Sequence, residues 1–212
     1  MSLSPISKNG LILSAFALVT TALVALVHDF TAPQIERQEQ QQLITTLEHL
    51  FPAGSYNNDL FNECILVTSE QFLGRPTPQK AFIARFNDEP VGIAIESTAP
   101  DGYNGSIDII VGILSDGTTA GVRVLNHKET PGLGDKIELR KSNWVMAFDR
   151  KQLADENDPL WKVKKDGGQF DQFTGATITP RSVVKAVKNT LLFYQQHQAR
   201  LFDNQPGCGG DK

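Results

Sequence analysis

Residues 171–194 read DQFTGATITPRSVVKAVKNTLLFY, a turn of small residues followed directly by a long amphipathic segment. Thr179 is a favourable N-cap, and Pro180 suits the first helical position because its φ fits and its missing N–H would have had no intrahelical partner. The sequence therefore predicts a helix from about Pro180, with apolar residues at three- and four-residue spacing that face a core. These residues are Val183, Val184, Val187, Leu191 and Tyr194.

Alternating and β-branched segments upstream predict antiparallel strands. The predicted strands are residues 80–86, 91–98, 107–114 and 118–125, and the last two form the clearest hairpin, joined through Ser115, Asp116 and Gly117. One face of that hairpin carries Ile107, Ile109, Val111 and Ile113. Loops are predicted on both sides of Cys64, at Pro52, Gly54, Gly74, Pro76 and Pro78. The predicted fold class is α+β, a twisted antiparallel sheet with packed helices.

The N-terminal part contains one apolar segment, residues 10–27, without a formal charge. It is long enough to cross a bilayer. Lys8 precedes it and acidic residues follow, so the positive-inside tendency places the N-terminus in the cytoplasm and the bulk of the chain outside. The alternative is a cleaved signal peptide, but no convincing cleavage site lies between Val24 and Pro33.

Composition excludes several classes of protein. The 212-residue chain has a net charge of -4 and no basic stripe, so nucleic-acid binding has no support. Its two cysteines, Cys64 and Cys208, form no CxxC motif, which disfavours thiol redox chemistry and iron–sulfur ligation. They form either a disulfide or two unrelated thiols. The four histidines lack the spacing of a metal site, and hydrolase chemistry is unsupported because there is no GxSxG motif.

The turn before the predicted helix has the chemistry of a phosphate site. Thr177 lies just outside the positive end of the helix, where free backbone N–H groups and the macrodipole favour a phosphate. Gly175 and Ala176 add little bulk, so a planar ligand can lie against the backbone there. The alternative is a helix start that is merely well capped.

The order Asp171, two spacers, Thr174, Gly175, Ala176 and Thr177 resembles the covalent flavinylation motif of FMN-binding domains. In that family FMN is joined to the last threonine through a phosphoester. The resemblance implies that Thr177 carries FMN and that a flavin transferase attaches it from FAD. It also implies that Asp171 belongs to the sequence that the transferase recognises.

Residues 126–137, NHKETPGLGDKI, contain an ETPGLG segment that the same family carries beside its flavin. The resemblance implies contacts to the ring from Thr130, Gly132, Leu133, Gly134 and Lys136, the lysine offsetting charge on the reduced flavin. A nucleotide loop is disfavoured, because P-loop spacing is absent and a GxGxxG match fails at Ile137. A metal site at His127, Glu129 and Asp135 is less favoured than a solvated polar loop.

With residues 99–107, APDGYNGSI, the chain resembles the family of G subunits of Rnf (Rsx) electron-transport complexes. The C subunits of sodium-pumping NADH:quinone oxidoreductases share the flavin motif, but they are usually longer and have serine where Thr174 stands. The resemblance implies an electron-relay subunit of a bacterial inner-membrane complex that couples electron flow to ion movement. Its partners would be the other membrane subunits.

The domain organisation expected from this resemblance begins with a cytoplasmic N-terminus at 1–9, a transmembrane helix at 10–28 and a stalk helix at 29–50. A periplasmic FMN-binding domain at 51–194 and a tail at 195–212 follow. Lys162, Lys164 and Lys165 would either neutralise the flavin phosphate or form a solvated turn. Two other functions stay open: a membrane-tethered module that binds a noncovalent ligand or a partner, and a flavin domain with its own reductase activity.

Overall fold

The computed structural model describes residues 4–203, 207 and 208. The chain divides into two compact units, Met1–Ile44 and Thr45–Lys212. Helix α1 (Pro5–Leu50) contains both the predicted transmembrane segment and the predicted stalk, with Pro33 inside it. Among the described residues it is the one helix long and apolar enough to cross a membrane. Its apolar side chains, among them Leu11, Phe16 and Leu23, are exposed in the isolated chain.

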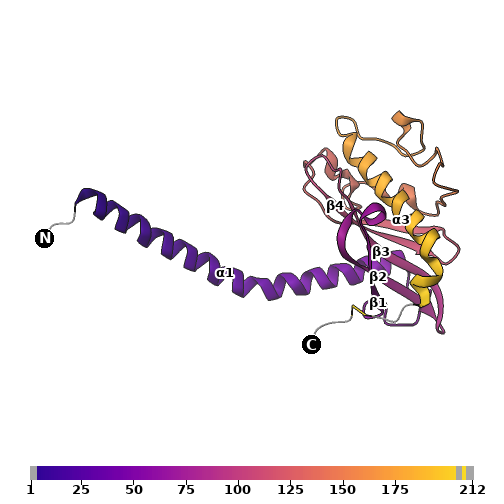
Figure 1. Ribbon diagram of the computed structural model, residues 1–212, viewed down its shortest axis with the longest axis horizontal. Coiled ribbons are helices and arrows are strands. Elements are labelled where there is room, and N and C mark those ends of the chain that lie inside the picture. The colour runs from indigo at the N-terminus through magenta and orange to yellow at the C-terminus, as the bar shows by residue number, and fades with distance from the viewer. Residues whose placement is uncertain (1–3, 204–206, 209–212) are drawn as a thin grey trace. The chain divides into compact units, whose positions relative to one another are not determined.

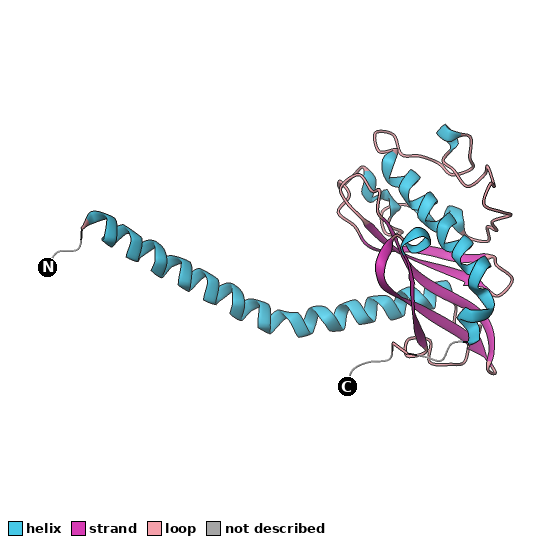
Figure 2. Cartoon of the chain, in the orientation of Figure 1, coloured by secondary structure: helices cyan, strands magenta, loops and turns pink. Residues whose placement is uncertain are grey.

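The second unit is built on a five-stranded antiparallel sheet whose strands are neighbours in chain order. The strands are β1 (Cys64–Ser69), β2 (Arg75–Phe86), β3 (Glu89–Ala99), β4 (Ile107–Leu114) and β5 (Thr119–Asn126). The helices are α2 (Glu70–Leu73), the short η1 (Gly134–Ile137), η2 (Asn143–Phe148) and η3 (Lys164–Asp166), and the long α3 (Ile178–Asp203). Figure 2 shows the sheet open, with helices packed on it, which confirms the predicted α+β class.

The hairpins follow from local sequence. Asn87 and Asp88 connect β2 to β3 and both have positive φ, 52° and 68°, which is typical of a tight turn whose twist matches the flanking strands. The predicted loop at Pro76 and Pro78 is wrong, because β2 already begins at Arg75. Pairing of β2 with β3 starts only at Ala81, so the two prolines lie where β2 has a neighbour on one side.

Helix α3 covers one face of the sheet (Figure 1). The predicted apolar stripe is buried, and it belongs to the same core cluster as the strand residues that alternate toward it. That cluster includes Ile93, Ile95, Ile107, Ile109, Val111, Ile113, Val183, Val187 and Leu191. Apolar side chains recur every second residue in β4 and every third or fourth residue in α3. The two apolar faces predicted from these spacings therefore meet in one core.

The other face of the sheet carries glycines and is covered by Leu50, the last residue of α1, and by Phe51. A Cβ on Gly92 would lie 2.5 Å from Phe51 Cε1 and 2.8 Å from the Ile113 carbonyl oxygen. A Cβ on Gly112 would lie 3.2 Å from Leu50 Cβ. Leu50 and Phe51 are buried at 3% and 1% exposure, so glycine is needed here for close approach.

Gly92→Val is expected to destabilise the second unit by about 1–3 kcal/mol, because the added side chain overpacks against Phe51 and a strand carbonyl. Thermal unfolding of the detergent-solubilised chain, followed by tryptophan fluorescence, measures the effect. Leu66→Val is the control, since Leu66 is 51% exposed on the edge strand and should change stability by less than about 0.5 kcal/mol. Equal melting temperatures for the two variants would contradict this packing.

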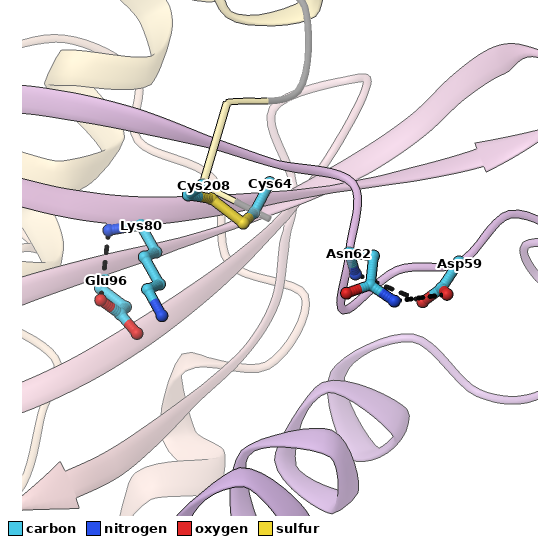
Figure 3. Close-up of a disulfide and its surroundings, with 6 residues drawn as sticks. All are labelled: Asp59, Asn62, Cys64, Lys80, Glu96 and Cys208. Atoms are coloured by element: carbon cyan, nitrogen blue, oxygen red, sulfur yellow. Dashed lines mark hydrogen bonds between the residues drawn. A yellow bond between two sulfur atoms is a disulfide. The ribbon is translucent and has the colours of Figure 1, made fainter. Parts of the chain in front are cut away.

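A disulfide joins Cys64 and Cys208, the two cysteines whose pairing the sequence left open (Figure 3). Their Cα atoms are 5.5 Å apart. The Gly207 and Cys208 amides donate to the Cys64 carbonyl at 2.8 and 3.3 Å. Helix α3 itself continues through Asp203, into the segment predicted as a tail, while residues 204–206 and 209–212 lie outside the described residues.

Candidate functional site

Three loops of the second unit meet at a cavity of about 300 Å³. One follows β3, one follows β5, and the third leads into α3. The cavity is lined by Tyr103, Glu129, Thr130, Leu133, Gly134, Gly175, Ala176, Thr177, Ile178 and Thr179. The two sequence blocks singled out for a flavin therefore face one common space.

Thr177 lies at the N-terminus of α3 and on the wall of the cavity. The helix begins at Ile178, earlier than predicted, and the Thr177 carbonyl accepts its first bond from the Arg181 amide at 3.3 Å. Within the described residues, no hydrogen-bond partner is recorded for the half-buried Thr177 hydroxyl. That hydroxyl is consequently available beside the free N–H groups and positive end of a 26-residue helix.

The predicted N-cap role of Thr179 is wrong. Thr179 is fully buried inside the first turn, and its hydroxyl donates to the Glu129 carboxylate, whereas an N-cap hydroxyl would accept from a backbone N–H of the helix. The position preceding the helix belongs to Thr177. A local N-cap rule did not detect this, because Thr179 is bound by a residue fifty positions earlier in the chain.

The turn before α3 is fixed by its own backbone and by aromatic packing. Gly175 has a φ of 81°, and the Ala176 amide donates to the Phe173 carbonyl at 3.1 Å. A Cβ on Gly175 would meet only Leu133 Cδ2, at 3.8 Å, so glycine is required for its φ and not for space. Phe173 packs edge-on against Trp144, with ring centroids 5.2 Å apart.

The loop after β5 folds back on itself. The Leu133 and Gly134 amides both donate to the Thr130 carbonyl at 3.1 Å. Gly132 has a φ of 79°, and its amide donates to Asp135 Oδ1 at 2.8 Å. A Cβ on Gly134 would lie 2.7 Å from Glu129 Oε2 and 2.9 Å from Thr179 Oγ1, so the loop and α3 are in close contact.

Glu129 links its own loop to the loop after β3 and to the first turn of α3. One carboxylate oxygen accepts from the Thr179 hydroxyl and the other from the Asn104 amide, at 3.0 Å for the amide. The prediction of a solvated polar loop is wrong here, since Glu129 and Asp135 are only 4% and 5% exposed. No cluster of three or more metal-ligating side chains occurs among the residues that the structure describes.

His127 forms hydrogen bonds to the Glu129 backbone and to the Glu138 side chain. His127 Nδ1 accepts from the Glu129 amide at 3.0 Å, and Nε2 is 2.7 Å from Glu138 Oε1. Burial would raise the pKa of Glu138, but hydrogen bonds from Arg140 and His127 outweigh it and hold that pKa below its ordinary value. Glu138 therefore remains an anionic acceptor for the His127 ring.

The structure brings six of the ten residues predicted for the cofactor site to the cavity wall: Thr130, Leu133, Gly134, Gly175, Ala176 and Thr177. The other four, Asp171, Thr174, Gly132 and Lys136, do not line it. The Asp171 carboxylate pairs with Lys164 Nζ at 2.6 Å, and the Lys136 carbonyl accepts from the Ser142 hydroxyl at 2.6 Å. Lys162 lines a different cavity.

Four lining residues were not predicted as contacts: Tyr103, Glu129, Ile178 and Thr179. Tyr103 belongs to the APDGYNGSI segment, whose position near the cavity depends on the turn after β3. Tyr103, Leu133 and Ile178 are 67%, 43% and 46% exposed. They give the cavity an apolar rim beside the polar Thr177 end, which matches a planar ring that carries a phosphate.

The comparisons with known proteins find an FMN-binding domain around this cavity. The FMN-binding domain family matches residues 102–192, which include the whole cavity wall. The RnfG N-terminal region matches residues 1–50, which contain α1. The chain belongs to the family of G subunits of ion-translocating oxidoreductase complexes.

Relatives named as G subunits of such complexes are similar over nearly the full length. The relative from Pseudoalteromonas atlantica is 55% identical over 203 residues, covering 96% of this chain and 94% of its own. Those from Vibrio atlanticus and Vibrio cholerae are 52% and 53% identical over 209 and 208 residues. These two alignments cover 99% and 98% of this chain and 100% and 99% of the relatives.

Proposed function

We propose that this chain is the electron-carrying subunit of a membrane-bound, ion-translocating oxidoreductase complex, and that it relays electrons through FMN esterified to Thr177. The observation that carries this proposal is the Thr177 hydroxyl. It has no recorded partner among the described residues, lies at the positive end of α3, and faces a cavity inside the region matched by the FMN-binding family.

Some residues at the cavity suit the phosphate of FMN, and others suit its ring. The free N–H groups of the first turn of α3 would hold the phosphate oxygens beside Thr177. Leu133, Tyr103 and Ile178 would provide apolar surface for the ring, and Thr130 would offer it a hydroxyl. FMN supplies the capacity to accept and donate electrons, whereas the chain holds it, orients it and sets its electrostatic surroundings.

Maturation requires that a flavin transferase reach the Thr177 segment and supply FMN from FAD. The exposure of the turn supports this route. The Asp171 side chain is 69% exposed even though it pairs with Lys164, and Thr174 is also exposed. We assign both residues to recognition during attachment, because neither lines the cavity.

We further infer a single-pass protein of the bacterial inner membrane with its second unit in the periplasm. Helix α1 meets the length and composition of a membrane span, and Lys8 precedes the apolar stretch. The Cys64–Cys208 disulfide supports an oxidising compartment for the second unit. The partners are then the other membrane subunits of the complex.

The chain produced with the flavin transferase is expected to keep its flavin fluorescence after denaturation and gel filtration. A chemical reductant should bleach the flavin, whereas NADH alone should leave it oxidised, because a relay takes electrons from a neighbouring centre. Fluorescence that elutes with small molecules would favour the noncovalent module. Rapid bleaching by NADH would favour a domain with its own reductase activity.

A further inference from the structure

Glu129 is the one acidic side chain among the described residues that line the cavity. It is 4% exposed, and both of its oxygens accept hydrogen bonds, from the Thr179 hydroxyl and the Asn104 amide. An ionised glutamate side chain has only acceptor oxygens, and both of these hydrogen bonds are of that kind. No salt bridge to Glu129 is recorded in the described part of the chain, so dipoles and not a cation balance its charge.

The position of this carboxylate is fixed from three sides. His127 holds the Glu129 backbone amide, and the Gly134 backbone approaches so closely that a Cβ there would lie 2.7 Å from Glu129 Oε2. Thr179 holds the same oxygen from the first turn of α3, two residues after Thr177. The negative charge is therefore held at a constant place in the cavity wall, close to the attachment residue.

We propose that Glu129 lowers the reduction potential of the flavin, an inference that rests on the proposed attachment of FMN to Thr177. Reduction adds electrons to the cofactor, and a buried negative charge nearby disfavours that addition. The charge is only weakly screened, because the carboxylate is almost completely excluded from water. Glu129 thus sets the energy of the relayed electrons, in addition to joining its own loop to the loop after β3 and to α3.

The test is a spectroelectrochemical titration of the flavin in the purified full chain. Glu129→Gln keeps the shape of the side chain and removes its charge. We expect the ratio of reduced to oxidised flavin at a fixed potential to rise on the order of tenfold. A tenfold change corresponds to about 30 mV for a two-electron couple. An unchanged or lower potential would overturn the proposal.

Asp135→Asn is the matched control. Asp135 lies in the same loop and is equally buried, but it does not line the cavity, and Lys141 lies 3.7 Å from its carboxylate. The control should therefore shift the potential clearly less than Glu129→Gln. Equal shifts in the two variants would show a general charge effect and overturn the specific role of Glu129.

Thr179→Val provides a second variant, which keeps the carboxylate and removes one of its donors. The potential should then stay the same or fall, and a rise would overturn the proposal. If Glu129→Gln folds without covalent flavin while Asp135→Asn carries it, Glu129 acts in attachment and the tuning role is also overturned. If the unaltered chain carries no flavin, the proposed function fails and not only the role of Glu129. The intact mass of the unaltered chain shows this before any titration.

Discussion

Thr177→Ala is expected to abolish covalent flavin completely, because it removes the oxygen that forms the phosphoester. The chain produced with the transferase should be colourless after denaturation. The variant should still fold, with a change in stability within about 0.5 kcal/mol, since no intrachain hydrogen bond of the Thr177 hydroxyl is recorded among the described residues. Visible absorbance of the denatured protein and its melting temperature measure the two effects.

Thr130→Ala is the matched control for this experiment. Thr130 is a threonine on the same cavity wall, but it belongs to the loop after β5 and not to the motif before α3. The control variant should therefore retain covalent FMN, and peptide mapping should place it on the fragment that contains Thr177. Loss of flavin in Thr130→Ala with retention in Thr177→Ala would contradict the assignment of the attachment site.

Cys208→Ser is expected to lower the free energy of unfolding by about 2–5 kcal/mol. The disulfide joins residues separated by 144 positions, so it restricts the unfolded chain over most of the second unit. It also holds the tail at the buried Cys64, where two amides donate to the same carbonyl. Urea unfolding of the full chain in detergent, followed by tryptophan fluorescence, measures the loss.

Reducing agent separates the disulfide from other effects of this substitution. The unaltered chain should become as unstable as Cys208→Ser when reductant is added, while the variant should not respond. Equal stability of variant and unaltered chain under oxidising conditions would contradict a stabilising role for the bridge.

Elements with a strong local pattern could be predicted from the sequence. The α3 stripe and the alternation in β4 each bury one face against the common core, so periodicity alone located them. The loop predicted at Pro76 and Pro78 is wrong, because a proline is tolerated in a strand that has a neighbour on one side only. That condition depends on the register of β2 with β3, which no local pattern reveals.

The candidate site was predictable only in part, for the same physical reason. Thr177 and Gly175 stand in a contiguous motif, so their types and spacing are enough to indicate a phosphate site. The burial of Glu129 depends on Asn104, from the loop after β3, and on Thr179, from the first turn of α3. The Cys64–Cys208 pairing likewise depends on where α3 ends relative to β1, and sequence separation does not specify that distance.

The most direct test of the covalent assignment is the intact mass of the chain produced together with the flavin transferase. The proposal predicts the polypeptide mass plus one FMN, less the water lost when Thr177 and the phosphate form an ester. A mass equal to that of the bare polypeptide, in preparations where the transferase is active on another substrate, would contradict it.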